Sequence, residues 1–244
     1  MKKNIEHSHH AEDIMQRLSV KPKRNYLRDW IYGGIDGAVT TFAIVSSVKG
    51  ANLATSVILI LGFANIIADG FSMAAANYLG TRSEKEEYDY YERYERQQIR
   101  RIPAGEAEEV RQIYSKKGLE GIALEKTVEH ITADEDLWVD TMMQEEYGLS
   151  PILRSPWKSA WATFLSFMLC GLCPLLPFVL RLADPFFWST ISVGIVFLVV
   201  GALKSLVSIE PMYKSALLTL AVGSGAAALA YGVGVLLRGL GASV

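Results

Sequence analysis

Cysteine is scarce in this sequence, whose 244 residues contain only Cys170 and Cys173. The pair forms a C-x-x-C inside an apolar run, without the βαβ pattern that a thioredoxin-like redox site requires. We therefore interpret both cysteines as small packing residues. The first 29 residues also lack an apolar segment behind their basic start, so the sequence predicts no secretory signal peptide.

Charge is missing from three long stretches, and this absence is the strongest indication of the fold class. Residues 159–180, 185–203 and 215–237 contain no charged side chain. Runs of about 20 apolar residues, at about 1.5 Å per residue, are long enough to cross a hydrocarbon core of about 30 Å. Residues 30–48 and 51–79 are two further runs, each with one acid. We therefore predict an all-α integral membrane protein with five transmembrane helices, rather than a soluble protein with buried core helices.

The two acids are Asp36 and Asp69, and a carboxylate within a bilayer is costly enough to suggest a function. The hairpin between the two runs is short, so their helices are expected to be antiparallel neighbours. Asp36, Asp69 and Met73 then fall at similar depths, with Asp69 and Met73 one turn apart on a shared face. For a lone aspartate the alternatives are a structural hydrogen bond to a neighbouring helix and a position near enough to the interface to stay hydrated, whereas two carboxylates and a thioether at matched depth favour a functional site.

Lysine and arginine are unevenly distributed, and this predicts the orientation of the chain. Residues 1–29 carry seven Lys and Arg, whereas residues 79–156 carry 18 acids against 11 bases. We predict that the N-terminus is inside, the C-terminus outside and the acidic block cytoplasmic. The predicted domains are a cytoplasmic tail (1–29), two spans (30–79), a cytoplasmic helical domain (80–156) and three spans (157–244).

The acidic block is expected to be a small helical domain. The second apolar helix is predicted to continue out of the membrane until Pro103 breaks it. Shorter helices are expected to end at Gly118 and Gly148 in left-handed caps, with Thr132 and Glu135 forming a capping box. A domain of about 75 residues without a strong core needs a partner, and a homodimer is the simplest one.

Carboxylates and methionines recur in this block at helical spacing. Glu106 and Glu109 share one helix face, and Met142, Met143 and Glu146 lie together on another helix. Carboxylates suit harder divalent cations and thioethers favour softer ones, so the pattern fits a borderline ion such as Fe²⁺. The alternative is a solvated acidic face with the methionines in the core.

Two other classes of protein stay open. A membrane-tethered di-iron carboxylate protein needs Glu-x-x-His pairs, and the only histidine of the block, His130, directly follows Glu129. A scaffold or metal sensor gains nothing from acids inside the membrane. The tract HSHH at residues 7–10 is a further candidate metal site, although a disordered terminus is the simpler interpretation.

Three segments together carry a resemblance: IYGGIDGAVTTFAIVSSVKGANL, SMAAANYLGTRSE and MMQEEYGLSP. They are similar to the vacuolar iron transporter family, over nearly the whole chain from Asn25. The resemblance implies five membrane helices, a homodimer and a cytoplasmic metal-binding domain built on the extension of the second helix. It also implies a transporter, not an enzyme, that exports Fe²⁺, sometimes Mn²⁺, from the cytosol in exchange for protons.

The resemblance further implies roles for individual residues. The pore ligands are expected to be Asp36 and Met73, with Asp29 at the pore entrance. Two positions depart from the family pattern, because Asn77 stands where an acid is usual and Asp69 replaces a small residue two turns deeper. The expected cytoplasmic metal ligands are Glu95, Glu106, Glu109, Met142, Met143 and Glu146.

The expected cargo is Fe²⁺ or Mn²⁺, with Zn²⁺ as a further ion at the cytoplasmic site and no permanently bound cofactor. The expected partners are divalent metal ions, protons, membrane lipid and a second copy of the chain, with no nucleic acid. A manganese-selective exporter with the same ligands is the alternative within transport. The basic tail without a targeting segment favours a bacterial inner membrane over an organelle membrane.

Overall fold

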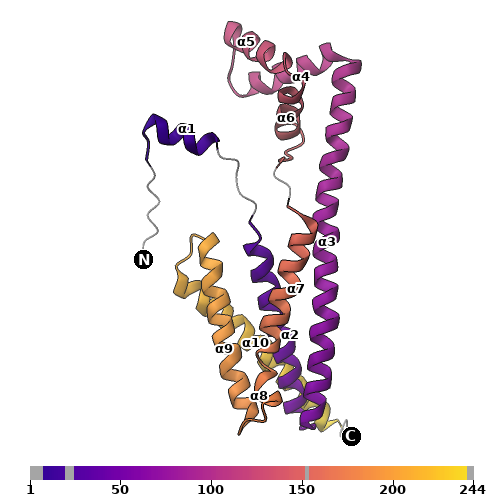
Figure 1. Cartoon of the computed structure of the whole chain (residues 1–244), viewed down its shortest axis with the longest axis vertical. Coiled ribbons are helices and arrows are strands. Elements are labelled where there is room, and N and C mark those ends of the chain that lie inside the picture. The colour runs from indigo at the N-terminus through magenta and orange to yellow at the C-terminus, as the bar shows by residue number, and fades with distance from the viewer. Residues whose placement is uncertain (1–7, 20–24, 152–153, 241–244) are drawn as a thin grey trace.

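The computed structural model describes residues 8–19, 25–151 and 154–240, which form helices and connecting turns without a strand. The predicted all-α class is therefore confirmed for this part of the chain. Figure 1 shows α3 running from a helical bundle at one end to a small group of helices at the other. The helices are α1 (Ala11–Ser19), α2 (Leu27–Gly50), α3 (Thr55–Arg101), α4 (Pro103–Lys116), α5 (Gly121–Thr132), α6 (Glu135–Glu145), α7 (Pro156–Leu172), α8 (Leu176–Val179), α9 (Pro185–Lys204) and α10 (Met212–Gly239), with a 3₁₀ turn at Ser205–Val207.

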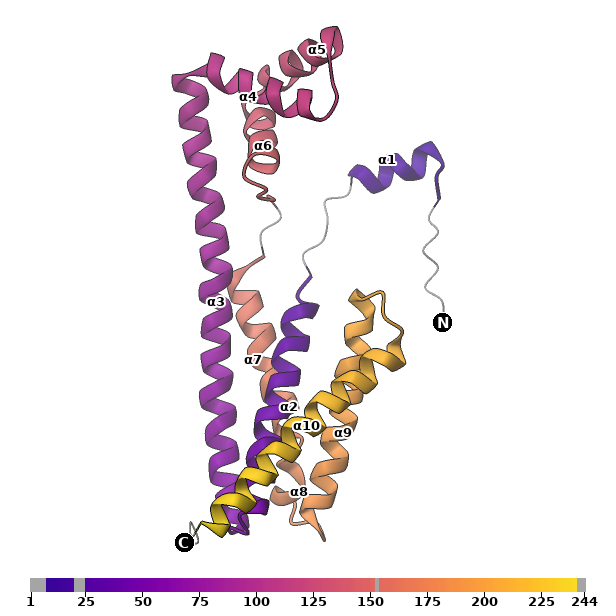
Figure 2. The ribbon, with the colours of Figure 1, turned by 180° about the vertical axis from the view of Figure 1, so that it is seen from behind.

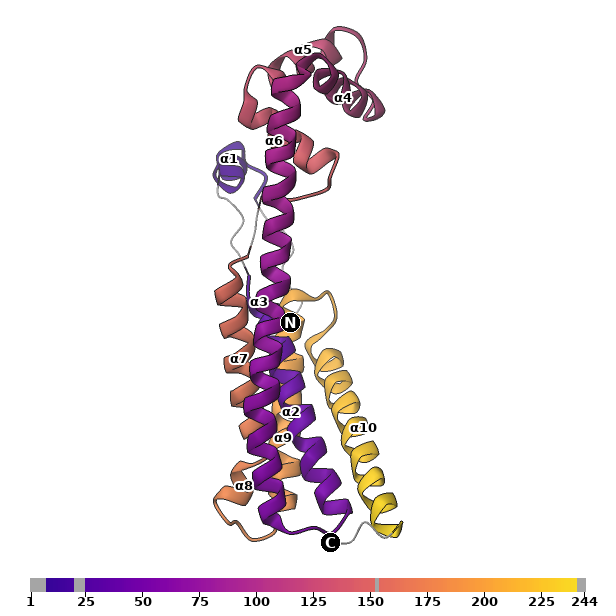
Figure 3. The same cartoon turned by 90° about the vertical axis from the view of Figure 1, so that its right-hand side faces the viewer.

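Helix α2 is the centre of the bundle, where it packs against α3, α7, α9 and α10. Figure 3 shows it between α3 and α10. Buried side chains such as Val45, Ile66 and Phe197 form the core of the bundle. Gly37 permits a very close approach of α7, because a Cβ atom at this position would lie 2.4 Å from the Phe167 carbonyl oxygen. Small residues of this kind let membrane helices pack backbone against backbone.

Four helices, α2, α3, α9 and α10, are long and apolar enough to cross a membrane among the described residues, where five were predicted. The run 159–180 does not form one helix, because α7 ends at Leu172 and a turn leads to the short α8. Pro174 and Pro177 lie in this segment, and proline interrupts a helix by removing an N–H donor and crowding the preceding turn. Helix α7 still runs beside α2 and α3, and five crossings stay a prediction.

Helix α3 continues without a break from its apolar half into its charged half, as the sequence predicted, and contains 47 residues. At about 1.5 Å per residue its length is about 70 Å. It ends at Arg101, and Pro103 begins α4. The expected boundary between residues 79 and 80 lies within this helix, and the four domain boundaries stay predictions.

The head, which we define as residues 80–149, comprises the charged half of α3 with α4, α5 and α6. Gly118 and Gly148 have φ angles of 92° and 66°, which confirms both left-handed caps. The predicted capping box of Thr132 and Glu135 is wrong. Asp134 is the N-cap residue of α6 instead, and its carboxylate accepts hydrogen bonds from two backbone N–H groups of the first turn.

The head has an apolar core of its own, contrary to the expectation from the sequence. Ion pairs add to it on the surface, where Arg96 contacts Glu92 at 3.0 Å within α3 and Asp136 of α6 at 2.8 Å. A homodimer therefore gains no support from a missing core, and it stays a prediction. The buried core residues are Tyr88, Ile99, Val110, Leu124, Val128, Ile131, Trp138, Val139, Met142 and Met143.

The first bundle helix begins and the last bundle helix ends on opposite sides of the bundle. Figure 2 shows α10 crossing the back of the bundle and ending far from the head, whereas α2 begins on the side nearer the head. Helix α1 is a separate short helix without a buried residue. Of the histidine tract at residues 7–10, His7 lies outside the described residues.

Candidate functional site

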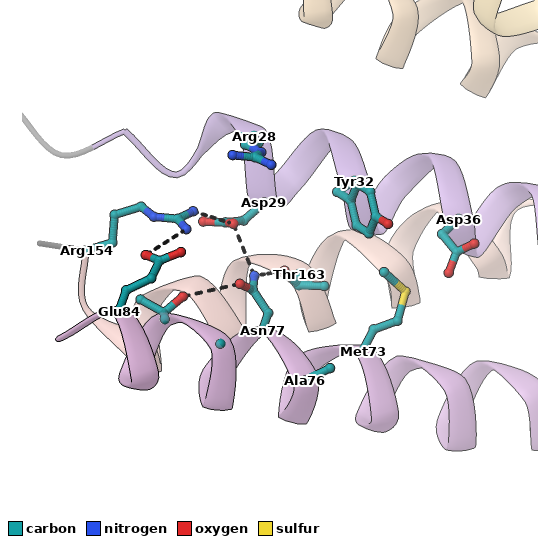
Figure 4. Close-up of a pocket in the computed structure, with 12 residues that line it drawn as sticks. Arg28, Asp29, Tyr32, Asp36, Met73, Ala76, Asn77, Glu84, Arg154 and Thr163 are labelled. Atoms are coloured by element: carbon teal, nitrogen blue, oxygen red, sulfur yellow. Dashed lines mark hydrogen bonds and ion pairs between the residues drawn. The ribbon is translucent and has the colours of Figure 1, made fainter. Parts of the chain in front are cut away.

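A cavity of about 560 Å³ lies between α2, α3 and α7. It occupies the end of the bundle nearer the head, where α7 and α2 begin and α3 leaves the bundle. Figure 4 shows side chains from these elements pointing into it. Its lining residues are Arg28, Asp29, Tyr32, Asp36, Met73, Ala76, Asn77, Gly80, Thr81, Glu84, Arg154 and Thr163.

Asp29, in the first turn of α2, lies at the outer part of this cavity and is only 4% exposed. Its Oδ1 accepts hydrogen bonds from Asn77 Nδ2 at 3.1 Å and from Arg154 Nη1 at 3.0 Å. Arg154 Nη2 also lies 3.6 Å from Glu84 Oε2. Asp29 Oδ2 is buried and has no hydrogen-bond partner in the described part of the chain. Sequence reasoning identified Asp29 but did not place Arg154 at this site.

Asn77 links three helices at the position where an acid was expected. Its amide donates to Asp29 on α2 and to Thr163 Oγ1 on α7, the latter at 2.7 Å. Its Oδ1 accepts from Thr81 Oγ1 at 3.3 Å. An ionised carboxylate has no N–H to donate and would repel Asp29. The amide therefore acts here as a crosslink between helices.

Asp36 and Met73 line the inner end of the cavity from α2 and α3, as their matched depths predicted. Figure 4 shows the carboxylate and the thioether on opposing helices, with Tyr32 beside them. Asp36 lies two turns beyond Asp29 on the same face of α2, about 10 Å along the helix. A carboxylate and a thioether supply one hard and one soft ligand, which suits a borderline divalent cation.

Asp69 lies one turn before Met73 on α3 and is not among the lining residues. Its carboxylate accepts a hydrogen bond from the side-chain amide of Asn65, whose Oδ1 accepts from Thr41 Oγ1 at 3.4 Å. It also lies close enough to Asp36 for the two charges to interact. This hydrogen bond lies within α3, so it is not the bond to a neighbouring helix that the sequence left as an alternative, and Asp69 connects to Thr41 of α2 only through Asn65.

In the head, Glu95 of α3 and Glu106 of α4 bring two carboxyl groups together, and Glu95 is only 1% exposed. Burial is the largest cause that raises the pKa of Glu95 to about 8, followed by its hydrogen bond with Glu106 and by the charges of Glu106, Glu146 and Glu109. Burial also raises the pKa of Glu106. Tyr147 OH, which the sequence reasoning missed, donates to Glu95 Oε2 at 3.4 Å. Burial and the closeness of the two carboxyl groups therefore favour a proton on the pair near neutral pH.

The other predicted ligands of the head differ in their burial. Met142 and Met143 of α6 are fully buried in the core of the head. Glu109 and Glu146 are exposed side chains, and partial loss of water around the Glu146 carboxyl, together with the charge of Glu109, raises the pKa of Glu146. Among the described residues, no three His, Cys, Asp or Glu side chains are grouped so that they could hold a metal ion.

Several known proteins similar to this chain are named vacuolar iron transporters. Residues 27–235 match the VIT family. The chain is 32% identical over 210 residues to vacuolar iron transporter 1 of Eucalyptus grandis, covering 85% of the chain and 84% of the relative. It is 34% identical over 210 residues to a vacuolar iron transporter of Centaurea cyanus, with coverage of 85% and 86%. It is 31% identical over 248 residues to a vacuolar iron transporter of Toxoplasma gondii, with coverage of 94% and 82%.

Proposed function

The chain belongs to the VIT family, a family of metal-ion transporters rather than enzymes, and from this premise we propose that it exports Fe²⁺ from the cytosol in exchange for protons. One observation carries the proposal: Asp36 and Met73 line the inner end of a cavity with several charged lining residues, whose outer part holds the buried Asp29. The path of the ion runs from Asp29 to Asp36 along one face of α2.

The cavity of one chain offers too few ligands for a dehydrated cation. Asp36 and Met73 are two ligands, whereas divalent transition metals take four or more in proteins. A homodimer that brings Asp36 and Met73 from each of two copies to one ion completes the set and supplies two negative charges. The pore is therefore proposed to lie at the dimer interface.

Protons and metal compete for this pore. Two carboxylates held close together favour binding of one proton when no cation is present, and a cation displaces it. Asp69 interacts electrostatically with Asp36 and is hydrogen-bonded to Asn65, so it is placed to accept the released proton. This competition is the condition for antiport.

The head is proposed to collect metal for the pore. Its predicted ligands are Glu95, Glu106, Glu109, Met142, Met143 and Glu146, and the proton shared by Glu95 and Glu106 leaves when the metal binds. Closing a site of this size requires movement of the exposed Glu109 and Glu146 toward the buried pair. Zn²⁺ is a further ion for this site, because its preference for carboxylate and sulfur ligands overlaps with that of Fe²⁺.

In the membrane, we propose that the N-terminus and the head face the cytosol, that the C-terminus lies outside, and that α7 with α8 forms a fifth crossing. An organelle membrane is at least as well supported as the bacterial inner membrane favoured by the sequence, because relatives in plants and in a parasite are named for the vacuole. Manganese is the alternative cargo, since the oxygen atoms of Asp29 and Asn77 in the outer cavity suit a harder ion.

Reconstitution into proteoliposomes tests the function. With an imposed pH gradient, Fe²⁺, Mn²⁺ and Zn²⁺ are added in turn, and metal and proton fluxes are followed together. The proposal expects Fe²⁺ flux that depends on the gradient and is accompanied by proton movement in the opposite direction. Flux without proton movement contradicts antiport, and no flux of any of the three ions contradicts transport.

A matched pair of variants assigns the flux to the pore. Asp36→Ala is expected to abolish transport while leaving the dimer intact, as judged by mass measurement in detergent. Glu87→Ala removes an equal charge from an exposed position of α3 and is expected to leave the flux unchanged. Unchanged export by Asp36→Ala removes Asp36 from the mechanism.

A further inference from the structure

Arg154 places a positive charge inside a cavity that is proposed to admit cations. It precedes α7, and its side chain is 24% exposed. Nη1 lies 3.0 Å from Asp29 Oδ1 on α2, and Nη2 lies 3.6 Å from Glu84 Oε2 on α3. Figure 4 shows the guanidinium between these two carboxylates. A cation that enters by way of Asp29 therefore meets a cationic group that is already bound there.

The carboxylate of Asp29 already has one cationic partner. A buried carboxylate is costly unless a positive charge or hydrogen-bond donors balance it. Arg154 supplies that charge, whereas the Asn77 amide supplies a donor without a charge. Both bind Oδ1, while Oδ2 stays buried without a partner among the described residues. Oδ2 is thus an unused ligand atom beside an occupied one.

We propose that Arg154 is a tethered counter-ion that the entering metal ion displaces from Asp29, and whose return to Asp29 releases the ion toward Asp36. This inference rests on the proposed function and adds a positioning residue to it. Without Arg154, a divalent cation binds Asp29 more tightly and leaves it more slowly. Arginine suits this role because its planar guanidinium can contact two carboxylates at once and stays charged at every physiological pH.

Equilibrium binding of Mn²⁺ tests the competition directly. Free Mn²⁺ is measured by electron paramagnetic resonance in titrations of the full-length protein in detergent. Arg154→Gln is expected to tighten Mn²⁺ binding by about ten-fold. A positive charge close to a carboxylate commonly weakens the affinity of that carboxylate for a proton by at least this factor, and it weakens the affinity for a metal ion by the same electrostatic effect. Arg82→Gln is the matched control, since Arg82 pairs with Glu86 on the exposed surface of α3 and its loss changes the net charge equally.

The gain in affinity must act through Asp29. In an Asp29→Asn background, Arg154→Gln is expected to produce no further gain, because the two residues form one interacting pair. Equal affinity of the Arg154→Gln and Arg82→Gln variants overturns the inference. A gain that persists in the Asp29→Asn background overturns it as well.

Transport kinetics separate this role from a merely structural one. Arg154→Gln is expected to lower both KM and kcat for the transported ion, and Arg154→Lys to restore both in part, because it keeps the charge without the planar fork. If Arg154→Gln does not fold, Arg154→Lys decides: a lowered KM supports the counter-ion role, and an unchanged KM contradicts it.

Failure of this inference is distinguishable from failure of the proposed function. If the wild-type protein moves no metal but Arg154→Gln still tightens Mn²⁺ binding through Asp29, only the transport proposal fails. If export proceeds and requires Asp36 but the two arginine variants behave alike, only the role of Arg154 fails.

Discussion

Asp36 and Met73 oppose each other across the inner end of one cavity, although they belong to different helices. The short turn between α2 and α3 makes the two helices antiparallel, so that positions far apart in sequence share a level. The inner end of the cavity therefore offers one hard ligand, the carboxylate, and one soft ligand, the thioether. The contribution of each residue can be tested by substitution.

Replacing the thioether is expected to change ion preference. Met73→Leu conserves volume, so the bundle should fold as before, but it removes the soft ligand found among the described residues that line the cavity. We expect Fe²⁺ flux to fall several-fold relative to Mn²⁺ flux in a competition assay. Met168→Leu is the control, because Met168 packs against the core of the bundle on α7 and does not line the cavity. An unchanged ratio of Fe²⁺ to Mn²⁺ in Met73→Leu removes Met73 from the ligand set.

Asp69 is expected to affect the proton more than the metal. Asp69→Asn keeps the size of the side chain and its ability to bond to Asn65, but it cannot exchange a proton. We expect metal flux to persist at a reduced rate while the number of protons moved per metal ion falls. Simultaneous recording of pH and metal in proteoliposomes gives this ratio. A wild-type ratio in the variant assigns Asp69 a structural role only.

Glu95 makes the metal-free head less stable as the pH rises. The pKa of Glu95 is raised from 4.5 in the unfolded chain to about 8 in the folded head, so the folded state binds more protons between these values. The stability that its protonation provides is present below about pH 4.5 and is lost as the pH rises through about 8. We expect hydrogen exchange in α4 and α6, corrected for intrinsic rates, to accelerate across this window.

The variant Glu95→Gln should flatten this pH dependence, because glutamine stays neutral. Glu129→Gln, at an exposed position of α5, should leave it as in the wild-type protein. Added Mn²⁺ is expected to restore protection at the upper end of the window by replacing the lost proton. A steep dependence that persists in Glu95→Gln contradicts the assignment.

Gly37 is expected to tolerate no side chain. A Cβ atom there would lie 2.4 Å from the Phe167 carbonyl oxygen and 2.9 Å from its Cα, and backbone atoms of a packed helix cannot move aside easily. Gly37→Ala should therefore cost about 1–3 kcal/mol, the usual cost of overpacking. Gly225→Ala meets open space in α10 and should be neutral or slightly stabilising. Thermal unfolding in detergent compares the two variants, and equal midpoints contradict the close contact between α2 and α7.

Features that depend on local pattern were predictable from the sequence. The long apolar runs indicated α2, α3, α9 and α10, and the glycines after the shorter helices indicated their left-handed caps. The meeting of Asp36 with Met73 followed from helix geometry and a short turn, which leave little freedom. The break after α7 was missed because a hydropathy pattern does not register Pro174.

Features that depend on contacts between distant segments were not predictable. The capping box failed because Asp134 competes with Thr132 for the start of α6, and only the packed turn decides between them. The core of the head was underestimated because its apolar residues are scattered among many charges. Arg154 is distant in sequence from both Asp29 and Glu84, and no local pattern links a base in a connecting segment to acids on two other helices.

The continuity of α3 has a mechanical consequence. From Met73 to Arg101 the helix extends about 42 Å without a proline or a break, so it behaves as a stiff lever with its short arm in the bundle. A tilt of about 5° at the cavity sweeps the far tip through an arc of about 4 Å, since that arc scales with the helix length. A small movement of α3 at the level of Met73 therefore produces a larger displacement where the carboxyl groups of α3 and α4 meet. A displacement of the head is transmitted through the same helix to the cavity.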